Sequence, residues 1–206
     1  MKAITPRQQD RRDRILECTR QQVARLGYDG VNMRELAVEA DVSTATLYNL
    51  FNSKDELILA ASEALLAGIA QKVEGRGLQR LIHQLEATAD VIISNPNYAD
   101  AMGRMLFAAE ASAPVVKMLM DDSRRVYEAL LQQMEAEGEL VGVVDVDKLA
   151  RNLAGVIWSV NLLWMKGFIA LHDFRQEYVG MLISYLLPWL TEDVKANYLK
   201  RSGLIR

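Results

Sequence analysis

The stretch Asn32–Phe51 reads NMRELAVEADVSTATLYNLF and contains two short amphipathic segments separated by Asp41 and Val42. Apolar residues recur in it at three- and four-residue spacing, which is the spacing of one face of an α-helix. The residues expected to face inward are Met33, Leu36, Ala37, Ala40, Val42, Leu47 and Phe51. The stretch therefore predicts two short helices joined by a tight turn.

The ends of these two helices carry favourable capping residues. Asn32 and Ser43 are preferred N-cap residues, and Glu35 follows Asn32 at the spacing of a capping box. Asp41 lies in the turn, where the backbone is expected to be left-handed, and Asp is one of the few residues besides glycine that tolerate this conformation. The pattern predicts a helix-turn-helix whose second helix is free to enter a DNA major groove.

Helical patterns continue on both sides of this stretch. A helix is predicted from about residue 10 to 26, with Gly27 as its C-terminal stop, after a polar arm at residues 1–10. Ser53 and Glu56 predict the start of a further helix. Residues 1–56 are thus expected to form an arm and a helix-turn-helix DNA-binding domain. Residues 57–206 are expected to form a larger helical domain, which gives an all-α fold of about nine to ten helices.

The charge of the chain does not by itself indicate nucleic acid as a partner. The formal net charge is −3, but residues 1–25 contain seven Lys and Arg against three Asp and Glu. The basic character therefore belongs to the arm and the first helix. One interpretation is a surface that binds phosphates, and the alternative is a solvated helix face rich in arginine.

Residues 11–57 resemble the DNA-binding domain of the tetracycline-repressor (TetR) family. The residues that carry this resemblance are Gly27-Tyr28, Leu36-Ala37, Val42-Ser43, Thr46-Leu47-Tyr48, Phe51 and Ser53-Lys54-Asp55-Glu56-Leu57. The chain departs from the family pattern at Asp41, which replaces the usual turn glycine, and at Asn49-Leu50, where the family often has His and Tyr. The second departure bears on the operator sequence and leaves the fold unchanged.

The resemblance implies which residues contact DNA. Thr44, Thr46 and Asn49 are expected to meet base edges, and Tyr48 and Lys54 are expected to contact phosphates. The full set of expected DNA-binding residues is Asn32, Arg34, Ser43, Thr44, Ala45, Thr46, Tyr48, Asn49 and Lys54. The alternative is a helical hairpin whose polar residues only face solvent.

The resemblance also implies a homodimer. In the family the eighth and ninth helices form a four-helix bundle across a twofold axis, and here residues 146–164 and 174–187 are the matching predicted helices. Each carries a long apolar seam. The alternative for any single residue of these seams is burial within the core of one subunit.

A ligand cavity among the fifth to eighth helices is a further implication of the resemblance. Soft methionine and aromatic side chains suit an adaptable apolar ligand, and Asn161 is a polar residue in an apolar run. The expected ligand-binding residues are Met102, Met105, Phe107, Met118, Trp158, Asn161, Trp164 and Met165. Plain core packing is the alternative for each.

Other classes of protein lack support in the sequence. His83 and His172 have no Cys or carboxylate at metal-ligand spacing, and no phosphate loop or nucleophile motif is present, so no enzyme, cofactor or metal site is predicted. Residues 1–14 are polar and basic, no segment is apolar enough to span a membrane, and Cys18 is the single cysteine. These features predict a cytoplasmic protein.

The sequence thus predicts a one-component transcriptional regulator, expected to be a repressor that binds a palindromic operator as a dimer and is released by a small apolar or amphipathic ligand. One alternative is a ligand-independent regulator that acts as an activator or a DNA-architectural protein. The other is a helical ligand-binding or scaffold protein with an inactive DNA module.

Overall fold

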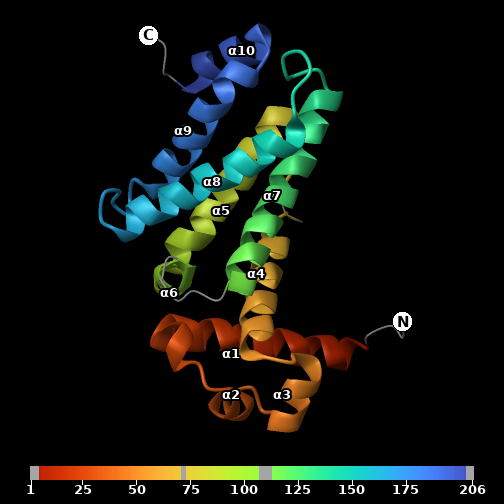
Figure 1. Ribbon diagram of the computed structural model, residues 1–206, viewed down its shortest axis with the longest axis vertical. Helices are drawn as coiled ribbons and strands as arrows, with labels where there is room; N and C mark the ends of the chain where they lie inside the picture. The colour runs from red at the N-terminus through yellow and green to blue at the C-terminus, as the bar shows by residue number, and fades with distance from the viewer. Residues whose placement is uncertain (1–4, 71–72, 107–112, 203–206) are drawn as a thin grey trace. The chain divides into compact units, whose positions relative to one another are not determined.

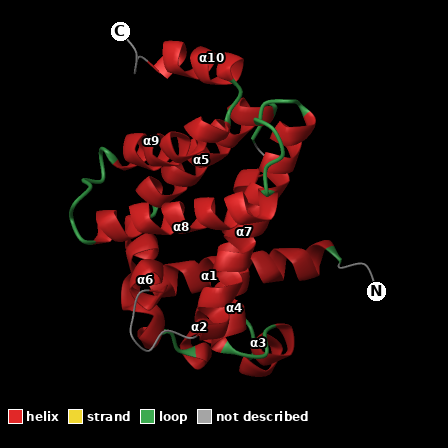
Figure 2. Cartoon of the chain, turned by 45° about the horizontal axis from the view of Figure 1, so that its top comes forward, coloured by secondary structure: helices red, strands yellow, loops and turns green. Residues whose placement is uncertain are grey.

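The computed structural model describes residues 5–70, 73–106 and 113–202 of the chain. Within these residues all regular secondary structure is helical (Figure 2). The only β-pairing among them is an isolated bridge between Leu140 and Leu190. The prediction of an all-α fold is confirmed. None of the described helices combines the length and the hydropathy that a membrane crossing requires.

Ten α-helices and one 3-10 helix follow each other along the described chain (Figure 1). Their bounds are α1 Pro6–Gly30, α2 Met33–Glu39, α3 Thr44–Leu50, α4 Lys54–Ala70, α5 Gly77–Ser94, α6 Pro96–Leu106, α7 Ala113–Ala136, α8 Val146–Met165, α9 Phe174–Leu186, η1 Leu187–Trp189 and α10 Glu192–Ser202.

The chain divides into two compact units. The first contains residues 1–71 and 94–119, and the second contains residues 72–93 and 120–206. Helix α6 therefore belongs to the same unit as the N-terminal helices, and it packs against α1. The division of function at residues 56 and 57 that the sequence suggests stays a prediction.

The prediction of a polar arm at residues 1–10 is wrong for residues 6–10, because α1 begins at Pro6. Thr5 and Gln8 form a capping box: the Gln8 N–H donates to the Thr5 hydroxyl, and the Thr5 N–H donates to the Gln8 amide oxygen at 2.9 Å. Pro6 suits the first helical position, where its missing N–H removes no hydrogen bond. Gly27 breaks α1 as expected, at a positive φ of 71°.

The core of the first unit joins α1, α2, α3 and α4. Its buried side chains include Ile15, Leu16, Leu36, Ala37, Leu47, Phe51, Leu57 and Ala61. The inward-facing residues predicted for the helix-turn-helix are buried, except for Val42, which is half-buried and packs against the same core. A buried hydrogen bond of 2.8 Å between the hydroxyls of Ser62 and Tyr98 ties α4 to α6. The second and third helices are therefore held on a continuous apolar base.

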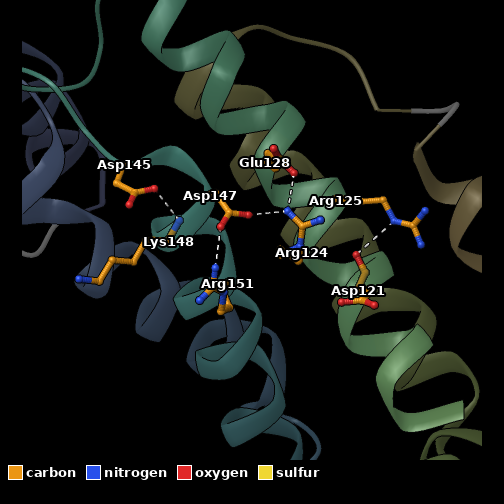
Figure 3. Close-up of polar contacts among 8 residues, drawn as sticks. All are labelled: Asp121, Arg124, Arg125, Glu128, Asp145, Asp147, Lys148 and Arg151. Atoms are coloured by element: carbon orange, nitrogen blue, oxygen red, sulfur yellow. Dashed lines mark hydrogen bonds and ion pairs between the residues drawn. The ribbon is translucent and has the colours of Figure 1, made fainter. Parts of the chain in front are cut away.

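The second unit has its own core, made by α5, α7, α8 and α9. The largest fully buried side chains in it include Leu81, Leu85, Leu131, Met134, Phe174 and Tyr178. A salt bridge also joins α7 to α8 (Figure 3). The Arg124 guanidinium donates to Glu128 on its own helix at 2.7 Å and to Asp147 on α8 at 2.6 Å, and Arg151 donates to the same Asp147 at 2.6 Å.

The ends of the later helices follow partly from sequence. Asp145 caps α8 by accepting the Lys148 N–H at 3.0 Å, and Pro188 follows the end of α9. Asp173 occupies the N-cap position of α9, but its side chain caps no N–H of that helix. It lies 3.2 Å from the His172 ring instead, so α9 begins without a cap from this side chain.

Candidate DNA-binding surface

The turn between α2 and α3 is a Schellman motif built on an aspartate. The Val42 N–H donates to the Ala37 carbonyl at 2.9 Å, and the Asp41 N–H donates to the Val38 carbonyl at 3.1 Å. Asp41 has a φ of 52°, so it occupies the left-handed position that glycine usually takes. The predicted conformation of the turn is confirmed.

The first turns of α2 and α3 are fixed by side-chain caps. The Asn32 amide oxygen accepts the Arg34 N–H at 2.9 Å, and the Ser43 hydroxyl accepts the Thr46 N–H at 3.0 Å. The Ser43 and Thr46 hydroxyls also bond to each other at 2.8 Å. Asn32, Ser43 and Thr46 thus hold the helix ends as well as being candidates for DNA contact.

Helix α3 separates its buried and exposed residues as the sequence predicts. Leu47 is fully buried, whereas Ala45 and Asn49 are exposed and Tyr48 is 48% exposed. Thr44 and Thr46 are half-buried. The exposed side chains are therefore small, polar or aromatic except for Leu50 at the end of the helix, which is 40% exposed. The segment from Ser43 to Phe51 contains no charged residue.

The start of α4 borders this surface. The Ser53 hydroxyl accepts the Glu56 N–H at 3.1 Å and caps the helix as predicted. The Glu56 carboxylate accepts the N–H of Asn52 at 3.1 Å, and Asn52 is one residue before the N-cap Ser53 whose N–H a capping box would use. Lys54 is half-buried, and its ammonium donates to the Tyr28 carbonyl at 3.1 Å.

Arginines of α1 offset the acidic residues near the turn. Arg25 pairs with Glu39 at 2.7 Å, and Arg14 lies 4.0 Å from Asp41. On α1 itself, the hydrogen bond from Arg20 lowers the pKa of the Glu17 carboxyl. These pairs remove part of the negative charge that would repel a phosphate backbone.

The N-terminal half of α1 keeps its own positive charge. Arg7 and Arg11 are exposed, and no carboxylate in the described part of the chain pairs with them or with Arg12. The Arg12 guanidinium lies 4.7 Å from the centre of the Phe51 ring, beside the end of α3. The charge that α3 lacks is thus available from a neighbouring helix of the same unit.

Sequence reasoning missed three residues that shape this surface. The positive charge of Arg12 and Arg14 and the family motif at Tyr28 do not indicate the contacts that these residues make within the protein. In the structure Arg14 bonds to the turn, Arg12 stacks on Phe51, and Tyr28 holds the start of α4. The resemblance to a family motif at Gly27-Tyr28 was the one signal that pointed to Tyr28.

The expected ligand-binding residues belong to two different units. In the first unit Met102 is buried and Met118 is half-buried, while the side chain of Met105 and the whole of Phe107 lie outside the described part of the structure. In the second unit Trp158, Asn161, Trp164 and Met165 are half-buried on α8. The Asn161 amide donates to the Ile157 carbonyl at 3.0 Å, and Trp164 packs edge-on against Phe174 at 5.6 Å. The ligand site stays a prediction.

Two capped helices cross on an apolar base, the second exposes polar and aromatic side chains, and basic residues flank it on α1 and α4. This arrangement defines a helix-turn-helix DNA-binding protein.

Comparison with known proteins gives the family. Residues 15–61 match the family model described as bacterial regulatory proteins, tetR family. The HTH-type transcriptional repressor KstR of Rhodococcus jostii is 34% identical over 171 residues, which cover 77% of this chain and 74% of KstR. The chain therefore belongs to the tetR family of transcriptional regulators, and the resemblance inferred from the sequence is confirmed.

Solved structures agree in fold. TylP, a tetR regulator from Streptomyces fradiae, matches with a TM-score of 0.73 at 23% identity, covering 93% of this chain and 92% of TylP. The transcriptional regulator FadR from Bacillus subtilis, solved in complex with stearoyl-CoA, matches with a TM-score of 0.66 at 14% identity, covering 84% of this chain and 97% of FadR.

Proposed function

We propose that this regulator is a repressor that binds a palindromic operator as a homodimer and is released by a small apolar or amphipathic ligand. It acts in the cytoplasm as a DNA-binding protein and not as an enzyme. The observation that carries the proposal is α3, which exposes Ala45, Tyr48 and Asn49 while Leu47 anchors the helix in the core.

The roles of the DNA-binding residues follow from their chemistry. The Asn49 amide suits adenine, and the Thr44 and Thr46 side chains offer a hydroxyl and a methyl group to base edges, with Ala45 permitting close approach. Tyr48 and Lys54 bind phosphates on one side of the recognition helix. Asn32, Arg34 and Ser43 bind phosphates at the flank, because they lie at the exposed starts of α2 and α3.

The dimer forms through α8 and α9. Gly155 and Ser159 are exposed on α8 at helical spacing, and Gly180 and Ser184 repeat this arrangement on α9 with at least partial exposure. Apart from neighbouring residues and the backbone of the same helix, nothing in the described structure lies within 4 Å of where a Cβ would stand at Gly155 or Gly180. Small side chains beside open space support close approach of a second pair of helices. Two linked half-sites also supply the specificity that one helix-turn-helix lacks.

The effector is an apolar or amphipathic molecule, and each unit contains candidate contacts for it: Met102 and Met118 in the first unit, and Trp158, Asn161, Trp164 and Met165 in the second. Soft and aromatic side chains suit such a ligand. The stearoyl-CoA complex of FadR supports this class, because FadR shares the fold. The ligand and the operator oppose each other by linkage: each weakens the binding of the other by the same factor.

Selection of bound sequences from a random duplex library tests the operator. We expect an inverted repeat whose half-site centres are about one helical turn, ~34 Å, apart, bound by two protomers. Recovery of no enriched sequence, with binding no tighter than to random DNA, would overturn the proposal.

Two further measurements address the dimer and the effector. Ser159→Arg should give a monomer by light scattering and lose cooperative operator binding, whereas Gln132→Arg, exposed on α7, should remain dimeric. Apolar and amphipathic compounds, with stearoyl-CoA among them, are then screened for a rise in melting temperature. A compound that raises the melting temperature without weakening operator binding is a ligand but not an effector.

A further inference from the structure

Tyr28 makes three separate contacts with the first two residues of α4. Its carbonyl accepts the Lys54 ammonium at 3.1 Å, and the same ammonium lies 4.3 Å from the centre of its ring. Its hydroxyl donates a short hydrogen bond to the carboxylate of Asp55. One residue at the end of α1 thus holds both neighbouring side chains at the start of α4.

The backbone around Tyr28 makes these contacts possible. Gly27 has a φ of 71° and interrupts the helix just before Tyr28, and the Val31 N–H shares the Tyr28 carbonyl at 3.3 Å. A carbonyl near a helix C-terminus attracts a cation because the helix dipole places negative partial charge there. The ring adds attraction through its quadrupole.

The Tyr28 hydroxyl stays a donor throughout the neutral range. Burial, with the hydrogen bond to Asp55 second, raises the pKa of Tyr28 to about 12. The hydroxyl therefore keeps its proton and occupies the Asp55 carboxylate. Lys54 and Asp55 are adjacent in the helix, so their side chains project in different directions. The carbonyl and ring of Tyr28 contact Lys54, and its hydroxyl contacts Asp55.

We propose that Tyr28 is a positioning residue for DNA binding, which holds the Lys54 ammonium at the start of α4 in the place where it meets a phosphate. This inference rests on the proposed function of Lys54 as a phosphate contact. A free lysine side chain loses much rotamer freedom when it binds, and a side chain that is already held loses less. One N–H of the ammonium bonds to Tyr28, and the ammonium has three, so it can bind Tyr28 and a phosphate at once.

The test uses the full chain and a random-sequence duplex, and measures the dissociation constant over a range of salt concentrations. Lys54→Ala should lower the slope of log affinity against log salt by about 0.9, the value for one lost phosphate contact. Tyr28→Leu removes the ring and the hydroxyl and should weaken binding about fivefold at low salt. Tyr28→Phe keeps the ring and the carbonyl and should lose less. Circular dichroism and melting temperature establish that each variant is folded.

The double variant separates positioning from a purely structural role. If Tyr28 acts through Lys54, Tyr28→Leu costs no further affinity once Lys54 is alanine. An equal loss in both backgrounds overturns the inference. If Tyr28→Leu does not fold, Tyr28→Met, which also lacks the ring that contacts Lys54, takes its place in the same cycle. A Lys54→Ala variant with unchanged affinity and slope removes the proposed phosphate contact and this inference together, whereas a wild-type chain that binds no DNA refutes the proposed function itself.

Discussion

The Nε atom of Arg14 donates a hydrogen bond of 2.9 Å to the carbonyl of Ala40. Arg14 lies on α1 and Ala40 is the C-cap residue of α2, so this bond joins the first helix to the turn that sets the angle between α2 and α3. The same side chain lies 4.0 Å from Asp41, whose backbone is left-handed. Arg14 thus supports the part of the helix-turn-helix where the chain departs from the usual glycine.

Loss of this bond should destabilise the first unit. Arg14→Ala leaves the partly buried Ala40 carbonyl without its arginine partner, and we expect the free energy of unfolding to fall by about 1–2 kcal/mol. Chemical denaturation measures the change. Arg11→Ala is the matched control, because Arg11 is exposed and should alter the free energy by less than about 0.5 kcal/mol. Equal effects of the two changes would mean that the bond adds nothing to stability.

The turn should become more stable when its left-handed residue is replaced by glycine. Asp41→Gly removes the steric cost of a Cβ at a φ of 52° and keeps both Schellman hydrogen bonds, which are backbone bonds. We expect the free energy of unfolding to rise by about 0.5–1 kcal/mol. Asp41→Ala should lower it, since alanine keeps the Cβ and has no polar side chain to favour this conformation. A glycine variant less stable than the wild type would show that the Arg14–Asp41 attraction outweighs backbone strain.

Glu139 gives the second unit a pH dependence whose sign can be worked out. Its carboxylate accepts the Leu78 N–H at 2.6 Å at the start of α5, which favours the charged form, but burial has the larger effect and Glu137 adds repulsion, so the pKa of Glu139 is raised. A raised pKa in the folded state means that folding favours the protonated acid. The stability from this group is therefore fully present below its unfolded pKa and is lost as the pH rises through the folded value.

Glu139→Gln tests this sign. Glutamine can still accept the Leu78 N–H but cannot ionise, so the wild type should lose stability relative to the variant as the pH rises from about 4 to 7. Denaturant titrations at several pH values measure the difference. Glu135→Gln is the control, because Glu135 is exposed on α7. Its replacement should leave the pH dependence of the free energy of unfolding unchanged. A difference between Glu139→Gln and the wild type that shrinks with rising pH would contradict the assignment.

How far the sequence predicts this structure depends on the separation of the interacting residues. The sequence predicts the caps at Ser43 and Ser53 and the buried face of Leu47 and Phe51, because each depends on residues a few positions apart. The bond from Arg14 to the turn spans 26 residues, and no local pattern marks it. The incorrect prediction of an arm at residues 6–10 has a local cause. Thr5 and Gln8 have the spacing of a capping box, which indicates a helix start at Pro6.

The candidate site shows the same division. The exposure of Ala45, Tyr48 and Asn49 follows from helical periodicity. The grouping of α6 with the N-terminal helices does not, because it depends on packing between α1 and residues beyond 94 in the chain. Long-range packing of this kind depends on the total apolar surface that is buried. The pattern of a single segment does not show which other segment it will pack against.

Base recognition and phosphate binding should separate when the residues of the surface are changed one at a time. Asn49→Ala removes an exposed amide that can pair with adenine, so it should relax the preference at one operator position, by about 1–3 kcal/mol between the best base and the others. Tyr48→Ala and Lys54→Ala should weaken binding to all sequences alike, because a phosphate carries no base identity. Competition titrations with operator duplexes changed at single positions measure both effects. Thr44→Val is a useful companion to Asn49→Ala, since it keeps a methyl group and removes the hydroxyl. If Asn49→Ala lowers affinity equally for every duplex, then Asn49 contributes to the binding of the backbone, and base reading must come from the threonines and Ala45 of α3.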